Sequence, residues 1–102
     1  MKPLRQVRVL INPRAGQGVS FDHLRAVMDR AWDRPGIDLT YQFSHSIADG
    51  KRKTRRAVGQ GVDTILAVGG DGMVNSIGGE LVDKPVALGV IPVGSGNGFA
   101  RH

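Results

Sequence analysis

The feature that most constrains the fold is a short apolar run followed by a glycine-containing loop, which occurs three times. The apolar runs lie at residues 7–11, 64–68 and 86–91, and the loops "NPRAGQG", "GGDG" and "PVGSGNG" follow them. Continuous apolar runs of this length are typical of strands buried on both faces, and Gly and Pro mark the turns that end them. The sequence therefore predicts a sheet whose strands end in glycine-containing loops.

Helical patterns separate these strands. Apolar residues recur at helical spacing after Ser20, a plausible N-cap, until "RPG" ends the helix near Arg34. Residues 37–43 alternate between apolar and polar, which predicts a half-covered strand at or near a sheet edge. Ser46 is a candidate cap for a helix that runs to Gly59, and residues 73–81 have a weakly helical pattern.

Strands that alternate with helices predict an α/β fold. We expect a three-layer, Rossmann- or flavodoxin-like architecture, with a mostly parallel sheet and helices on both faces. The loops "NPRAGQG", "SHS", "GGDG" and "GSGNG" then share one edge of the sheet, where open α/β sheets bind ligands. We expect residues 1–102 to form one domain or part of one. Because the last strand lacks a final cover, we also expect either a longer protein, of which this chain is a fragment, or a partner that supplies the missing layer.

Composition excludes several classes of protein. The chain has no cysteine, which excludes disulfides and thiolate metal sites, and no apolar run long enough to span a bilayer. The formal net charge of +5 favours an anionic partner. Residues 51–56, "KRKTRR", are distributed around most of a helix, so a solvated face is the simpler interpretation. Aromatic residues make up only 5% of the chain, which disfavours a platform on which single-stranded nucleic acid stacks and makes nucleic acid an unfavoured partner, although the basic pI of about 10.5 keeps a nucleic-acid binder as a further alternative.

The "GGDG" turn has the chemistry of a phosphate site. Gly69, Gly70 and Gly72 let the backbone turn sharply and bring several N–H groups together, and the start of a helix adds its positive dipole. A type I′ hairpin is the alternative, because Asp-Gly favours that turn. The flanking sequence favours a strand followed by a helix.

Asp71 places a carboxylate among these amides. It becomes favourable beside phosphates if it binds Mg²⁺, directly or through water, or accepts a proton from an attacking hydroxyl. The alternative is an Asx turn, in which the side chain bonds its own loop.

The other two glycine loops have similar properties. Ser95 and Asn97 stand between glycines in "GSGNG", although Asn97 is equally suited to cap the next helix. Arg14 in "NPRAG" is placed to contact a phosphate, or the loop only connects a strand to a helix. The three histidines have no metal-ligand spacing, and we interpret them as surface residues.

Together, "INPRAG", "GGDGMVNSI" and "IPVGSGNGFAR" resemble the catalytic domain of the diacylglycerol kinase family, which includes bacterial lipid kinases, sphingosine kinases and ceramide kinases. NAD kinases and 6-phosphofructokinases share "GGDG" alone. The resemblance implies that Asp71 is catalytic. It also implies a set of nucleotide-binding residues: Asn12, Pro13, Arg14, Ala15, Gly16, Ser44, Gly69, Gly70, Asp71, Gly72, Met73, Val74, Asn75, Gly94, Ser95, Gly96 and Asn97.

The sequence departs from the family at several motif positions. Met73 stands where Thr is usual, Ser76 replaces a common Glu, and Gly98 stands where bacterial members often have Asp. The residues that bind metal are not identified by the motifs.

The resemblance implies an ATP- and Mg²⁺-dependent kinase that transfers the γ-phosphate to a diacylglycerol- or sphingosine-like lipid hydroxyl. It also implies a cytoplasmic protein, peripheral at the inner membrane face, whose second, β-rich domain completes the site; we expect this chain alone to be inactive. A non-catalytic nucleotide- or phosphate-binding module, a fragment of an NAD-kinase-like enzyme and a homo-oligomer are alternatives that stay open.

Overall fold

The structure, a computed structural model, describes residues 5–13, 21–32 and 35–92. Strands and helices alternate strictly along this part of the chain. Their order is β1 (Arg5–Ile11), α1 (Phe21–Trp32), β2 (Ile37–Phe43), α2 (Ile47–Gly59), β3 (Thr64–Gly69), α3 (Asp71–Glu80) and β4 (Ala87–Pro92). The predicted elements are therefore present with bounds that differ by one or two residues. Ser20 and Arg34 lie outside the described residues.

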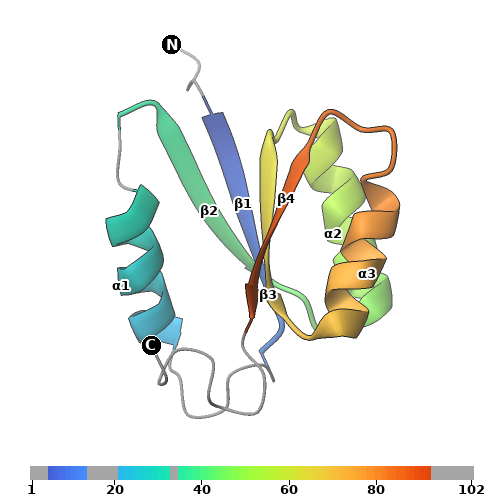
Figure 1. Cartoon of the computed structure of the whole chain (residues 1–102), viewed down its shortest axis with the longest axis horizontal. Helices are drawn as coiled ribbons and strands as arrows, with labels where there is room; N and C mark the ends of the chain where they lie inside the picture. The colour runs from blue at the N-terminus through green and yellow to red at the C-terminus, as the bar shows by residue number, and fades with distance from the viewer. Residues whose placement is uncertain (1–4, 14–20, 33–34, 93–102) are drawn as a thin grey trace.

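The sheet is parallel throughout, with the strand order β2-β1-β3-β4. This is the start of a flavodoxin-like order, in which the chain moves outward in one direction and then crosses to the other side of β1. All four strands point the same way in Figure 1, so their carboxyl ends meet at the lower edge of the sheet. The predicted parallel α/β fold is confirmed.

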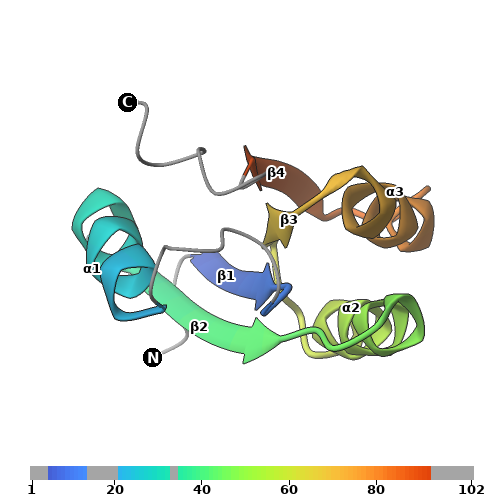
Figure 2. The ribbon, with the colours of Figure 1, turned by 90° about the horizontal axis from the view of Figure 1, so that it is seen from below.

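Two hydrophobic clusters, one on each face of the sheet, hold the layers together. α1 covers one face, while α2 and α3 cover the other, as Figure 2 shows along the strands. The buried residues of the α1 cluster are Val7, Val9, Ile11, Leu24, Met28, Leu66 and Val68. Those of the α2–α3 cluster are Leu10, Ala57, Val62, Ile65, Ala67, Met73, Ile77 and Leu81. β1 and β3 contribute residues to both clusters, so both faces of these strands are buried. This burial explains why their sequences are almost continuously apolar.

β4 differs from the prediction of a buried strand. It pairs with β3 on one side only within the described residues, and Val90 near its end is 48% exposed. Leu88 is the better covered residue, because α3 packs against it at Gly78. A Cβ at Gly78 would lie 3.6 Å from Leu88 Cδ2, which is an ordinary van der Waals distance, so the contact between α3 and β4 does not itself require a glycine here.

α2 begins with a side-chain cap and a buried acid. Ser46 is the N-cap, and its Oγ accepts a hydrogen bond from the Asp49 amide at 3.0 Å. The Asp49 carboxylate in turn accepts from the His45 amide, from Lys53 Nζ and from Arg52 Nη2. These bonds, that of the His45 amide foremost, lower the pKa of Asp49 to about 2.

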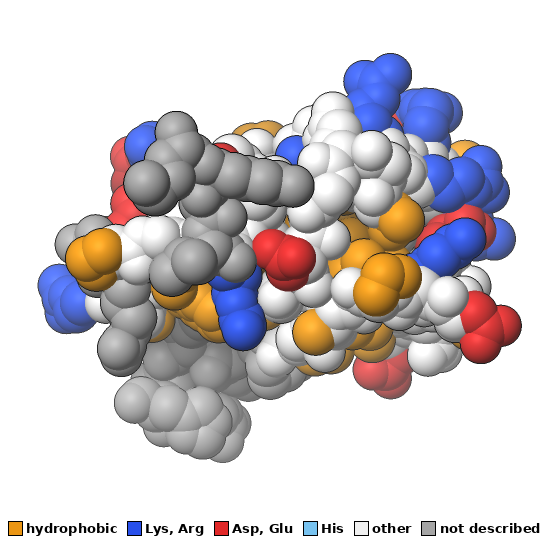
Figure 3. Space-filling model, turned by 90° about the horizontal axis from the view of Figure 1, so that it is seen from above, with side chains coloured by type: hydrophobic (Ala, Val, Ile, Leu, Met, Phe, Trp, Pro, Cys, Tyr) orange, Lys and Arg blue, Asp and Glu red, His pale blue; other side chains and the backbone are white. Residues whose placement is uncertain are grey.

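The outer surface of α2 is basic. Arg52, Arg55 and Arg56 are exposed, and Figure 3 shows Lys and Arg side chains gathered on the side of the molecule where α2 and α3 lie. Arg55 Nε donates to Glu80 Oε1 at 2.7 Å, which links α2 to α3. Lys53 instead extends toward the sheet and donates to the Phe43 carbonyl. Among the described residues, no helix has the length and apolarity that crossing a membrane requires.

Replacing Ile77 with Ala is expected to destabilise the fold. Ile77 lies in α3, is 0% exposed and belongs to the α2–α3 cluster. Its truncation leaves a cavity, which should lower the free energy of unfolding by about 2–5 kcal/mol. Chemical denaturation measures this change. Val82→Ala is the control, since Val82 is 64% exposed, and an equal loss in both variants would contradict the assigned core.

Acid should weaken the fold through Asp49. Its pKa of about 2 in the folded chain lies below the ordinary value of about 4, so the ionised carboxylate stabilises the fold above pH 4. This contribution is lost as the pH falls from about 4 through 2. The difference in unfolding free energy between the wild-type chain and Asp49→Asn should therefore shrink over that interval. Urea titrations from pH 7 to pH 2 measure it, and a constant difference would refute the expectation.

Candidate functional site

A cleft of about 350 Å³ opens at the carboxyl edge of the sheet. Loops after β1, β2 and β3 form it together with the first turns of α2 and α3. Its lining residues are Asn12, Ser44, His45, Ser46, Ile47, Gly70, Gly72, Met73 and Ser76. The volume lies at the lower end of the range for small-molecule sites. The cleft also lies at the point where the strand order reverses direction: the chain passes from β1 to β2 on one side and then crosses to β3 on the other. Open α/β sheets usually bind their ligands at such a point.

The fourth predicted loop follows β4. Pro92, the last residue of β4, pairs with Gly69 at the end of β3, so the register places the end of β4 beside the glycine turn. The predicted site residues of this loop, and three from the first loop, lie outside the described residues: Arg14, Ala15, Gly16, Gly94, Ser95, Gly96 and Asn97.

Two helix N-termini meet at the cleft, and they differ in how they are capped. Ser46 caps α2 with its side chain. α3 begins after Gly70, which provides no side-chain hydrogen bond to the first turn. The first backbone N–H groups of a helix have no intrahelical partner, and the helix dipole adds partial positive charge there. The start of α3 is therefore suited to bind an anion.

The glycines of the turn act by leaving space. None of Gly69, Gly70 and Gly72 has a positive φ, so the sharp turn predicted for them does not use left-handed backbone. A Cβ at Gly69 would lie 2.5 Å from Met73 Sδ and 3.3 Å from Asn12 Cβ, so a larger residue here would have to displace the Met73 side chain. A Cβ at Gly70 or Gly72 would meet nothing within 4 Å, so both leave room at the cleft wall.

Asp71 is the first residue of α3 and is exposed. It adjoins Gly70 and Gly72, yet it is not among the residues that line the cleft. Residues 71 and 75 share a different side of the helix from Gly72 and Ser76. The hairpin alternative is wrong, because β3 leads into a helix. No hydrogen bond joins the Asp71 carboxylate to the described residues, so they give no support to an Asx turn.

The other predicted residues divide between the cleft and its surroundings. Asn12, Ser44 and Met73 line the cleft, together with the two glycines. Pro13 and Asn75 are exposed outside it, and Val74 packs against the α2–α3 cluster instead.

Ser44 occupies a closely fitted position on the cleft wall. The residue is 5% exposed, its amide donates to the Ile11 carbonyl at 2.8 Å, and its Oγ donates to the Ser46 carbonyl at 3.2 Å. On the opposite wall, Ser76 Oγ donates to the Met73 carbonyl at 2.9 Å. Both hydroxyl oxygens keep acceptor capacity for a ligand.

Four lining residues were not predicted: His45, Ser46, Ile47 and Ser76. The first three follow Ser44 directly in the sequence. The prediction that the "SHS" loop lies at the carboxyl edge of the sheet could therefore have identified them. Ser76 lies three residues after Met73 on the same side of α3, a relation that becomes visible once the helix is known to start at Asp71.

The cleft lining mixes polar and apolar residues and carries little charge of its own. Three serines and Asn12 line it together with Ile47 and Met73, and His45 is its one titratable side chain among the described residues. Asp49, Arg52 and Lys53 form the ionised cluster behind the β2 loop, with one more positive than negative charge. The described residues contain no group of three His, Cys, Asp or Glu that could hold a metal ion. The site is thus suited to bind a ligand with anionic and hydroxyl groups.

Comparison with known proteins gives consistent results. The diacylglycerol kinase from Bacillus subtilis (strain 168) is 31% identical over 100 residues, which are 96% of this chain and 33% of that protein. The diacylglycerol kinase from Mycobacterium tuberculosis (strain H37Rv) is 31% identical over 97 residues, covering 95% of this chain and 31% of the relative. The chain therefore spans about a third of the length of these relatives.

Solved structures share the fold. A Bacillus anthracis str. Sterne protein assigned as a diacylglycerol kinase superposes with a TM-score of 0.72 at 27% identity, over 99% of this chain and 34% of that one. A phosphate-loop protein matches with a TM-score of 0.57 at 17% identity, which shows a likeness of fold alone. The family model of the diacylglycerol kinase catalytic domain matches residues 6–102. The chain belongs to the diacylglycerol kinase catalytic domain family.

Proposed function

We propose that this chain is the nucleotide-binding part of an ATP-dependent kinase, which transfers the γ-phosphate to a diacylglycerol- or sphingosine-like lipid hydroxyl. The observation that carries the proposal is the cleft between two helix N-termini, of which α3 has no side-chain cap. Free amides and a positive helix end complement the charge of phosphates. Membership of the diacylglycerol kinase catalytic domain family supports the reaction class.

The nucleotide is proposed to bind along the described cleft and the two adjoining loops. Gly70 and Gly72 leave room for phosphates to approach the backbone of α3. Ser44 and Asn12 offer polar groups on the opposite side. The remaining contacts implied by the resemblance belong to residues 14–16 and 94–97.

Mg²⁺ fits this site as an ion carried by the nucleotide. Mg²⁺ is commonly held by one or two carboxylates together with substrate phosphates and water, so a complete protein cage is not required. Asp71 is exposed beside the cleft, and its carboxylate is a suitable ligand. The bound ion would neutralise charge on the β- and γ-phosphates.

Asp71 is proposed to act in the transfer, either as a metal ligand or as the base. In the reaction, the lipid hydroxyl oxygen forms a bond to the γ-phosphorus, and the bond from that phosphorus to the bridging oxygen breaks. ADP leaves with the electron pair. The hydroxyl proton passes to a carboxylate, for which Asp71 is the candidate.

Encounter with the lipid is proposed to take place at a membrane surface, with the protein in the cytoplasm and peripheral to the inner membrane face. The exposed arginines of α2 support this, because anionic headgroups attract Lys and Arg near the surface. The β-rich domain implied by the resemblance is proposed to complete the lipid site.

A non-catalytic phosphate-binding module is the second candidate. It is favoured by the cleft lining, which includes no acidic side chain among the described residues. Transfer of phosphate from ATP to diacylglycerol by the complete protein separates the two functions. Binding without transfer would favour the module.

ATP should bind to this chain through its phosphates. We expect a dissociation constant on the order of 1 mM or tighter, within the usual range for enzyme substrates. Adenosine lacks the groups that the start of α3 would contact, so its binding should be at least about tenfold weaker. Calorimetric titration with each compound measures this. Absent ATP binding, or equal binding of adenosine, would refute the proposal.

Asp71→Asn should abolish lipid phosphorylation in the complete kinase while the domain stays folded. The amide cannot accept the proton or supply a charged metal ligand, and loss of such a group typically costs at least about 10²-fold in rate. Asp83→Asn is a matched control, because Asp83 is exposed and its φ of 62° suits Asn as well as Asp. Initial rates and thermal melts compare the variants, and retained activity in Asp71→Asn would remove this residue from the mechanism.

A further inference from the structure

The loop between β2 and α2 is a wall of the cleft only three residues long. Ser44, His45 and Ser46 all line the cleft. β2 ends at Phe43 and α2 starts at Ile47, so the wall takes its shape from the way these two elements are joined.

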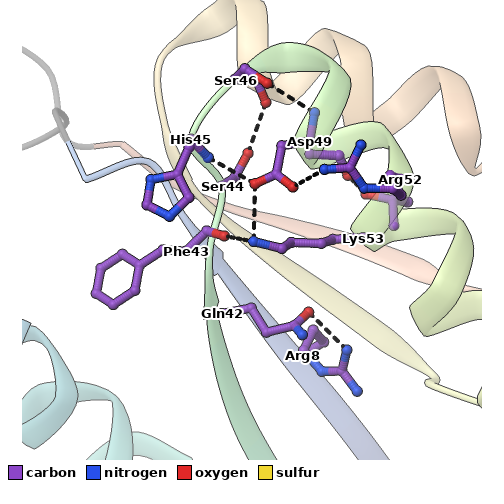
Figure 4. A network of polar contacts seen from close by, with 11 residues as sticks. Arg8, Gln42, Phe43, Ser44, His45, Ser46, Asp49, Arg52 and Lys53 are labelled. Atoms are coloured by element: carbon purple, nitrogen blue, oxygen red, sulfur yellow. Dashed lines mark hydrogen bonds and ion pairs between the residues drawn. The ribbon is translucent and has the colours of Figure 1, made fainter.

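The peptide groups on both sides of Ser44 are bound by one ion pair (Figure 4). Lys53 Nζ donates to the Phe43 carbonyl, which precedes Ser44. The His45 amide, which follows Ser44, donates to Asp49 Oδ2 at 3.0 Å. Lys53 Nζ and Asp49 Oδ2 are themselves 2.9 Å apart. Ser44 is therefore held from both sides through the Asp49 carboxylate.

The same carboxylate joins the wall to the start of the helix. In a capping box, the acid at the third helical position bonds the amide of the N-cap residue. Here Ser46 is the N-cap and bonds the Asp49 amide, but the carboxylate reaches one residue further back, to His45. The hydrogen bond from the His45 amide to the Asp49 carboxylate thus restrains His45, which lines the cleft, as well as the start of α2.

Packing leaves Ser44 little freedom apart from this loop. A Cβ at Gly50 would lie 2.7 Å from Ser44 Oγ, so α2 approaches the serine as closely as a glycine allows. Gly50 is fixed in turn, because the buried Thr54 Oγ1 donates to its carbonyl at 2.7 Å. A shift of the loop therefore requires a shift of the first turns of α2.

Electrostatics and loop geometry predict opposite effects on anion binding if the Asp49 carboxylate is lost. Asp49 is negative and is paired with Lys53 and Arg52, the latter at 2.6 Å. Removing its charge would leave two cations behind a cleft that is proposed to bind phosphates, and simple attraction would then strengthen anion binding. Loss of the loop's shape would weaken it.

We propose that Asp49 is a positioning residue for the nucleotide, because its carboxylate fixes the Ser44–Ser46 wall through the His45 amide and Lys53. The inference rests on the proposed function, since it names ATP as the ligand that the wall meets. Asp49 touches no ligand itself and acts through the loop.

Asp49→Asn tests the role through the sign of its effect. ATP should bind this variant roughly tenfold more weakly than the wild-type chain, at a temperature well below unfolding. Glu80→Gln is the matched control, because it also removes the acid of an ion pair with α2 but lies at the far end of α3 from the cleft. Its ATP affinity should stay within about twofold of wild type. Unchanged or tighter binding to Asp49→Asn would overturn the role.

A second readout separates positioning from a general loss of stability. The His45 amide should exchange with solvent faster in Asp49→Asn than in Glu80→Gln, measured by NMR without nucleotide. If Asp49→Asn does not fold, Lys53→Gln removes the bond to Phe43 and should also weaken ATP binding, and unchanged affinity in that variant would overturn the inference. A wild-type chain that binds no ATP refutes the proposed function and the ligand named here. Wild-type binding with an unaffected Asp49→Asn refutes the role of Asp49 alone.

Discussion

Parallel pairing of β1 on both of its edges is the constraint on which the site depends. β2 pairs with one edge and β3 with the other, and all three strands end on the same side. The chain must return along the sheet after each strand, which requires a crossover helix every time. The two helices that follow β2 and β3 pack on the same face, so their N-termini meet beside the end of β1. The cleft is a consequence of this topology.

The two helix starts at the cleft meet the same physical requirement in different ways. α2 satisfies its first amides with Ser46 and uses Asp49 to restrain the preceding loop. α3 starts after a glycine that has no side chain for capping. A helix end whose amides stay available suits a ligand that carries its own acceptors, while the capped helix provides a rigid wall opposite it.

The glycine turn and Asp71 have separate places in this arrangement. Gly69 leaves room for the Met73 side chain between β3 and α3, whereas a Cβ at Gly70 or Gly72 would meet nothing within 4 Å. Asp71 lies on a neighbouring side of α3, two residues after Gly69, which pairs with Pro92 of β4. A carboxylate there stands beside the proposed phosphate site rather than inside it, which would lessen its repulsion of phosphate and leave it accessible to a metal ion.

The sequence by itself determined the alternation of strands and helices, because apolar period and glycine position are local properties of the chain. It also placed "SHS" and "GGDG" on one edge, since parallel strands allow no other arrangement, and its motifs indicated the family. Only the tertiary structure decided which side of α3 faces the cleft, and so separated Asp71 from Ser76. It alone showed the partners of Asp49 and the exposure of Val90. Those depend on the rotation of a helix about its axis and on which neighbours cover a strand, and both are set by packing between distant segments.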